Sequence, residues 1–132
     1  MLAQLKEDLA ALADPHKAAV LSRFFKTGKG EYAEGDSFLG VAVPEQRKIA
    51  RKYNSLSLSD AEALLVSPIH EHRLTALFIL VLQFRNGDAG TKKKIFELYL
   101  RNTGRINNWD LVDSSAEHIV GAYLHGRDKA LL

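Results

Sequence analysis

The chain has 132 residues, no cysteine and a formal net charge of +2. This length suits a single domain over residues 1–132, and the missing cysteines exclude disulfides, thiolate nucleophiles, iron–sulfur clusters and cysteine-ligated zinc. The weak positive charge by itself supports no claim of nucleic-acid binding.

No segment has the length and composition of a membrane span or a signal peptide. The longest apolar run, Leu77–Leu82, is far shorter than the roughly 20 residues that cross a bilayer. Residues 1–12 contain Lys6, Glu7 and Asp8, whereas a signal peptide needs an apolar stretch there. We therefore expect a cytoplasmic protein that does not enter a membrane.

Helix signals begin at the N-terminus. A first helix is predicted by four leucines at helical spacing, Leu2, Leu5, Leu9 and Leu12. Asp14 and Pro15 supply an N-cap and a first-turn proline for a second helix, which extends to Phe25 and stops at Gly28. A glycine-rich connection to Val43 follows, and it is longer than most connections between helices.

Two further helices are predicted in the middle of the chain. Pro44 begins a helix that runs through Tyr53. Ser59 and Glu62 form a capping-box pattern for a short helix that ends near Val66.

The rest of the chain is also predicted to be helical. Ser67–Pro68 opens a long apolar helix that Gly87 stops, and further helices are expected over 91–102 and 108–125. Only Phe38–Val43 resembles a short strand, and a proline follows it at once. Much of the core is expected from the long helix, through Leu74, Leu77, Phe78, Leu80, Val81 and Phe84.

These elements predict an all-α fold. A compact bundle and a stack of antiparallel helix pairs both fit, and we favour a HEAT-like helical-repeat solenoid because the pairs recur at roughly 40 residues. The last residues, 129–132, resemble the start of another apolar segment. We therefore expect a solenoid that is incomplete at the C-terminus.

The segment Asn107–Asp113 carries the most informative candidate residues. Trp109, the only tryptophan, and Asp113 are four residues apart, so on a helix they lie on one face. That face is otherwise apolar, through Ala116, Val120, Tyr123 and Leu124. A buried carboxylate costs several kcal/mol unless it is paired or serves a function. Asp113 is therefore either a functional carboxylate or the N-cap of a helix that begins at Ser114.

A second candidate is the basic face of the helix that follows Pro44. Arg47 and Arg51 are four residues apart, as are Lys48 and Lys52, so together they form a broad cationic face. Such a face suits duplex phosphates, although an ordinary solvated face has the same pattern. The histidines lack the spacing of metal ligands, so we expect no metal site.

Three segments together resemble the AlkD-like family of DNA alkylation repair proteins: Gly35–Arg47, Ile69–Leu77 and Asn108–Asp113. The resemblance implies a HEAT-like solenoid whose concave surface binds duplex DNA. It also implies a DNA glycosylase that excises N3- and N7-alkylated purines without a cofactor. By this resemblance Asp113 is the catalytic carboxylate, and Trp109 is an aromatic wall against the deoxyribose at the lesion.

The resemblance covers the N-terminal portion of the family's solenoid. Later repeats in the family contribute a further tryptophan and an arginine, for which this chain has no counterpart, so it is expected to lack full activity alone. We expect a monomer that binds double-stranded DNA with alkylated purines. The alternative is a non-catalytic helical-repeat scaffold that binds DNA or protein, since fold alone does not imply chemistry.

Overall fold

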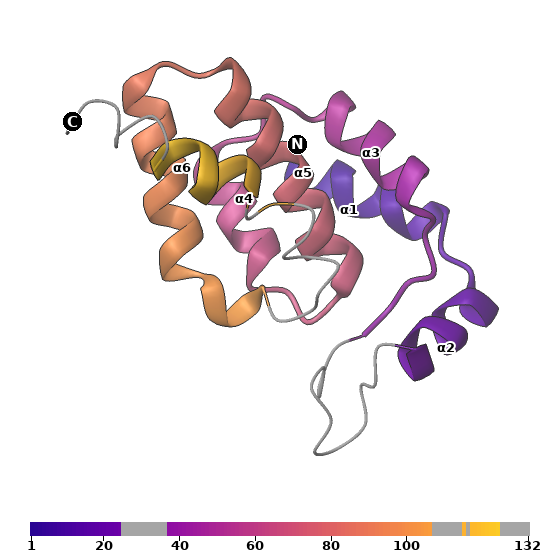
Figure 1. Ribbon diagram of the computed structural model, residues 1–132. Helices are drawn as coiled ribbons and strands as arrows, with labels where there is room; N and C mark the ends of the chain where they lie inside the picture. Colours follow the sequence, from indigo (N-terminus) through magenta and orange to yellow (C-terminus); the bar gives the residue numbers. More distant parts are fainter. Residues whose placement is uncertain (25–36, 107–114, 116, 125–132) are drawn as a thin grey trace.

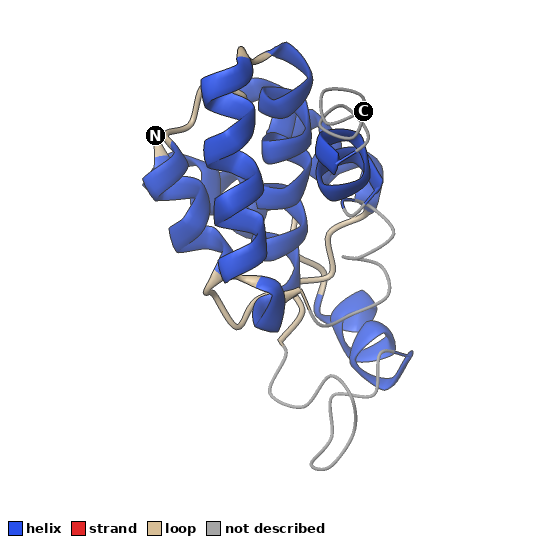
Figure 2. Cartoon of the chain, turned by 60° about the vertical axis from the view of Figure 1, so that its left-hand side comes forward, coloured by secondary structure: helices blue, strands red, loops and turns tan. Residues whose placement is uncertain are grey.

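The computed structural model describes residues 1–24, 37–106, 115 and 117–124, and most of them are helical. The described residues form six α-helices: α1 (Leu2–Ala11), α2 (Pro15–Phe24), α3 (Val43–Lys52), α4 (Leu58–Leu65), α5 (His70–Asn86) and α6 (Ala89–Arg101) (Figure 1). A 3-10 turn, η1 (Thr103–Arg105), and a π-helix, η2 (Glu117–Gly121), follow. The described residues form no strand, only an isolated bridge between Ser37 and Ile69 (Figure 2). The all-α prediction is confirmed.

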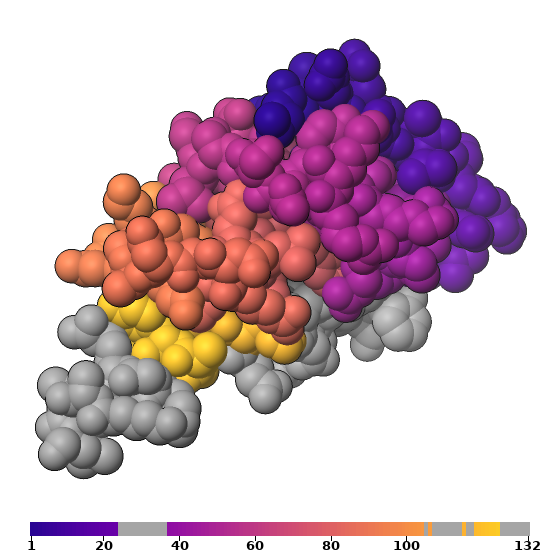
Figure 3. Space-filling view, turned by 90° about the horizontal axis from the view of Figure 1, so that it is seen from above, coloured from indigo at the N-terminus to yellow at the C-terminus, as the bar shows by residue number. Residues whose placement is uncertain are grey.

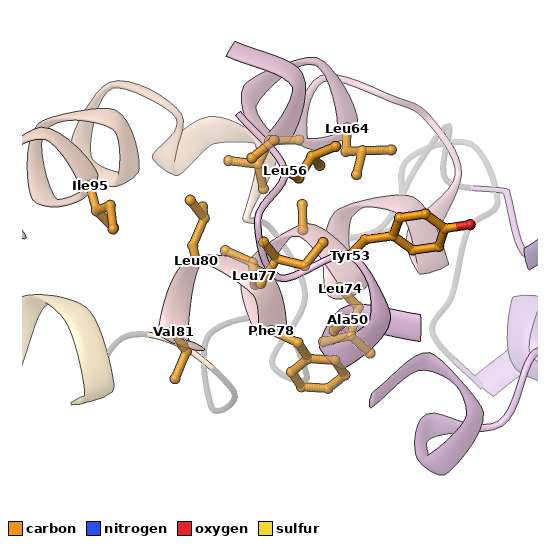
Figure 4. Close-up of a cluster of buried hydrophobic side chains, with 14 of the residues drawn as sticks. Ala50, Tyr53, Leu56, Leu64, Leu74, Leu77, Phe78, Leu80, Val81 and Ile95 are labelled. Carbon is orange, nitrogen blue, oxygen red and sulfur yellow. The ribbon is translucent and has the colours of Figure 1, made fainter. Parts of the chain in front are cut away.

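Helix α5 is the centre of the fold. It packs against α3, α4, α6 and η2, and every residue from His70 to Val81 is buried. The predicted core residues of this helix are all buried: Leu74, Leu77, Phe78, Leu80, Val81 and Phe84. Figure 4 shows the first five of them within the buried cluster. A helix enclosed on all sides is apolar around its circumference, which explains the long apolar run in the sequence.

Helices α5 and α6 form an antiparallel pair. Only Gly87 and Asp88 connect them, and two packed helices joined by so short a turn run in opposite directions (Figure 1). Gly87 caps α5, as predicted. The HEAT-type period of the helix pairs stays a prediction. None of the described helices combines the length and the apolar character that a bilayer span requires.

Side-chain caps set the starts of α2 and α6. The Asp14 carboxylate accepts the N–H groups of His16 and Lys17 at 3.0 and 3.2 Å, so the predicted start of α2 is confirmed. Asp88 accepts the N–H of Thr91 at 2.8 Å, and α6 therefore begins two residues before the predicted position.

The predicted capping box of α4 is wrong. Ser57, not Ser59, is the N-cap, and its hydroxyl accepts the N–H of Asp60 at 3.1 Å. Glu62 does not reach back to the helix start, because its carboxylate accepts hydrogen bonds from α6 and its C-cap. Arg101 Nε donates to it at 2.8 Å and Asn102 Nδ2 at 2.6 Å. These bonds tie α4 to α6 and lower the pKa of Glu62.

The start of α5 is set by the segment that precedes α3. The predicted opening at Ser67–Pro68 is two residues early, because Ile69 is extended and forms a bridge with Ser37. The Ser37 N–H donates to the Pro68 carbonyl at 2.9 Å, and the His70 N–H donates to the Ser37 carbonyl at 2.8 Å. The connection before α3 is therefore fixed to the N-terminal end of α5.

Candidate functional site

Two of the predicted basic residues, Arg47 and Arg51, line a pocket of about 350 Å³ between α3, α5 and η2. Figure 3 shows the magenta surface of α3 next to the salmon surface of α5, which in turn adjoins the yellow surface of residues 117–124. The pocket is lined by Arg47, Ala50, Arg51, Phe78, Val81, Leu82, Arg85 and His118. No acidic side chain occurs among the described residues that line it. The pocket is therefore complementary to an anion.

Arg47 is held in place by an aromatic ring of α5. Its Cζ atom lies 4.2 Å from the centroid of the Phe78 ring, and Phe78 is itself buried. A planar guanidinium stacks well on an aromatic face, and the stack leaves its N–H groups at the edge free to donate. Packing thus orients Arg47 before any ligand binds.

Arg85 and His118 join the two other walls of the pocket. Arg85 Nη2 donates to His118 Nδ1 at 3.1 Å, because a guanidinium has no acceptor. With Nδ1 accepting, the ring hydrogen is on Nε2, which can donate in turn. The bond connects the last turn of α5 to η2, and both side chains add N–H donors to the pocket.

These two residues were not identified from the sequence. Arg85 and His118 are 33 residues apart, so only the packing of η2 on α5 brings them together. One local signal was present, since Phe78, Leu82 and Arg85 recur at helical spacing on one side of α5. The spacing of the histidines in the sequence gives no signal for a role of His118. Among the described residues no group of three His, Asp or Glu side chains is placed to hold a metal ion.

The two lysines of the predicted basic face lie apart from the pocket, and each has a carboxylate nearby. Lys48 Nζ is 3.6 Å from Glu45, and Lys52 Nζ is 2.9 Å from Asp8. Tyr53 Oη also donates to Asp8, at 2.6 Å. The hydrogen bonds from Tyr53 and then Lys52 lower the pKa of Asp8. The basic face thus divides into an arginine side towards α5 and a lysine side towards α1.

The predicted catalytic residues, Trp109 and Asp113, lie outside the described residues. The chain that follows them is described at Ser115 and over 117–124, and it packs on α5 and α6. Ile119 is fully buried, and the Ser115 hydroxyl lies 3.0 Å from that of Tyr99, whose pKa is raised by burial. His118 places this segment at the edge of the pocket lined by Arg47, Arg51 and Arg85, which we call the arginine pocket.

A comparison with protein families matches residues 5–132 to a family described as DNA alkylation repair enzyme. The match spans nearly the whole chain, so the chain belongs to this family, as the resemblance of its three segments predicted. Membership supports a role in DNA alkylation repair and an enzymatic activity. Comparisons with curated proteins and with solved structures gave no match.

Proposed function

We propose that the chain belongs to a DNA glycosylase that acts as a monomer and excises positively charged N3- and N7-alkylated purines from duplex DNA. The observation that carries this proposal is the family match, which includes the Trp109–Asp113 segment. The arginine pocket supports it, because a concave surface with N–H donors and no acidic side chain among its described residues suits DNA phosphates.

The proposed chemistry uses the charge that alkylation places on the base. When the bond between C1′ and N9 breaks, its electron pair goes to the purinium, which leaves as a neutral base. The deoxyribose becomes an oxocarbenium-like cation, and the Asp113 carboxylate stabilises that charge. Water then adds to C1′ and loses a proton, which leaves an abasic site. The base needs little acid assistance because its leaving form is uncharged.

Trp109 is proposed to pack at the lesion beside the sugar. An indole face there excludes bulk water and attracts the developing cation by about 0.5–2 kcal/mol. Exclusion of water also strengthens the interaction between Asp113 and the sugar, because the local dielectric constant falls.

Arg47, Lys48, Arg51 and Lys52 are proposed to contact DNA phosphates without reading the bases. The two arginines contribute more in this proposal, since they already line the donor-rich pocket. The lysines contribute less, because Lys52 must give up its bond to Asp8, and Lys48 its proximity to Glu45, before either binds a phosphate.

Release of the modified base tests the proposal. The protein, including any residues encoded after Leu132, is incubated with a duplex that carries a single 7-methylguanine and with the same duplex undamaged, and free base is measured by chromatography. We expect release of 7-methylguanine only. If both duplexes bind and no base is released, the chain is a DNA-binding scaffold instead.

A further inference from the structure

The arginine pocket combines a cationic rim with an apolar floor. The floor is formed by Ala50, Phe78 and Val81, which are buried, and by the half-buried Leu82. A site for a phosphate alone needs donors but no apolar wall. The volume of the arginine pocket, about 350 Å³, lies at the small end of the roughly 300–1,000 Å³ typical of ligand pockets. Its shape and chemistry therefore suit a ligand in which an anion is joined to a compact apolar group.

We propose that this pocket holds one phosphodeoxyribose unit of duplex DNA, an inference that rests on the proposed function. The C–H face of the sugar lies against Phe78 and Val81, and the phosphate accepts N–H groups from Arg47, Arg85 and His118. The backbone is the outermost part of a duplex, so the unit enters without disturbing base pairs. A base would reach the same pocket only after unstacking, which costs a few kcal/mol.

The N–H donors of the arginine pocket are held in place by other side chains, unlike the mobile lysines of an ordinary basic surface. Arg47 is fixed by its stack on Phe78 at 4.2 Å, and Arg85 by its 3.1 Å bond to His118. Fixed donors hold one phosphate in one orientation, whereas mobile lysines attract any phosphate that passes. One phosphate of the bound strand therefore contributes far more than its neighbours.

The pocket also lies beside the segment that continues from Trp109 and Asp113. His118 is only five residues after Asp113 in the sequence, and it forms part of the pocket wall. A sugar-phosphate held here fixes the position of the strand relative to that segment. The dominant phosphate is therefore expected at a constant number of nucleotides from the damaged base.

The first test compares variants on an undamaged duplex, so it does not depend on excision. Arg47→Lys keeps the charge but loses the stacked planar donor, and Arg85→Gln loses both charge and bond to His118. Each is expected to weaken binding about 10-fold, the scale of a hydrogen bond between charged groups. Lys93→Arg and Lys93→Gln are the controls, since Lys93 is exposed on α6 and does not line the pocket. Thermal melting verifies that all four variants fold.

The second test replaces single phosphates by neutral methylphosphonates around a tetrahydrofuran abasic analogue. A methylphosphonate at one position is expected to lower the affinity about 10-fold, and at the neighbouring positions less than about 3-fold. Arg85→Gln should abolish that difference. The proposal is overturned if Arg47→Lys binds undamaged duplex as tightly as the unmodified protein does. It is also overturned if methylphosphonates at all positions lower the affinity equally. If both tests give the expected results but 7-methylguanine is not released, the proposed chemistry is contradicted and the proposed binding site is supported.

Discussion

The Glu71 carboxylate of α5 accepts the backbone N–H of Gly40 at 2.9 Å, and it also accepts the N–H groups of Leu39 and Val41 at 2.9 and 3.2 Å. Glu71 is buried, so these three bonds satisfy a carboxylate that burial would otherwise penalise. The same connection touches the start of α2, because the Asp14 N–H donates to the Leu39 carbonyl at 2.8 Å. One side chain thus organises the junction from which α3, with its arginines, begins.

Gly40 is expected to be irreplaceable at this junction. Its φ of +83° is unfavourable for other residues, and an added Cβ would lie 2.1 Å from the Asp14 carbonyl oxygen. Gly40→Ala should therefore lower the free energy of unfolding by at least about 2 kcal/mol in urea denaturation. Gly104→Ala is the control, because a Cβ there would have no neighbour within 4 Å. Equal stability of the two variants would mean that the connection rearranges freely.

The cluster of Asp8, Lys52 and Tyr53 predicts a change of stability in acid. The hydrogen bond from Tyr53, and next that from Lys52, lower the pKa of Asp8 in the folded state below its ordinary value of 3.8. The stabilisation is thus complete above the unfolded pKa and is lost as the pH falls through the folded pKa. The stability difference between the unmodified protein and Asp8→Asn should be constant above about pH 5 and shrink below about pH 4.

Tyr53→Phe serves as the matched background for that measurement, because it removes the first cause of the pKa shift. In this background the acid-dependent part of the Asp8→Asn effect should become smaller. If the effect of Asp8→Asn on the free energy of unfolding does not vary between pH 2 and pH 7, the hydrogen bonds from Tyr53 and Lys52 do not stabilise the ionised carboxylate.

Charge reversal of the two pocket arginines should reduce DNA binding without regard to sequence. Arg47→Glu with Arg51→Glu removes two phosphate contacts, so duplexes of unrelated sequence should lose affinity about equally. The slope of log K against log salt should flatten by about 2. Fluorescence anisotropy over a range of salt concentrations measures both quantities.

Lys93→Glu with Lys94→Glu makes the same change of net charge on the exposed side of α6, outside the pocket. This control variant should retain most of the DNA affinity of the unmodified protein and most of the slope of log K against log salt. If the arginine reversals behave like the lysine reversals, the arginine side of α3 is a solvated surface.

Local chemistry explains which parts of the fold were predictable from the sequence. Asp14 and Gly87 mark helix ends through contacts with their own neighbours, so their patterns suffice. Ser57 and Ser59 each precede an acidic residue by three positions, and the pattern alone does not choose between them. The choice depends on Glu62, whose carboxylate is already engaged by Arg101 from α6.

The candidate site was predictable only in part, because its walls come from distant segments. The i, i+4 spacing placed the four basic residues on one helix face, but residues next to each other in sequence point about 100° apart. Helix α1 therefore meets Lys52 while Phe78 of α5 meets Arg47. The pairing of Arg85 with His118 depends on how η2 packs, and no local pattern encodes that.

The most direct test of the proposed function is the effect of Asp113→Asn, introduced into the full-length protein, on excision of 7-methylguanine. The substitution keeps the shape and hydrogen-bonding capacity of the side chain and removes its negative charge. If Asp113 stabilises the sugar cation, the rate of base release falls at least about 100-fold, by analogy with the roughly 2.7–4 kcal/mol attached to one well-placed electrostatic group. DNA affinity and melting temperature should change little in the same variant. Unchanged excision together with a sharply lower melting temperature would contradict the account and identify Asp113 as a structural cap.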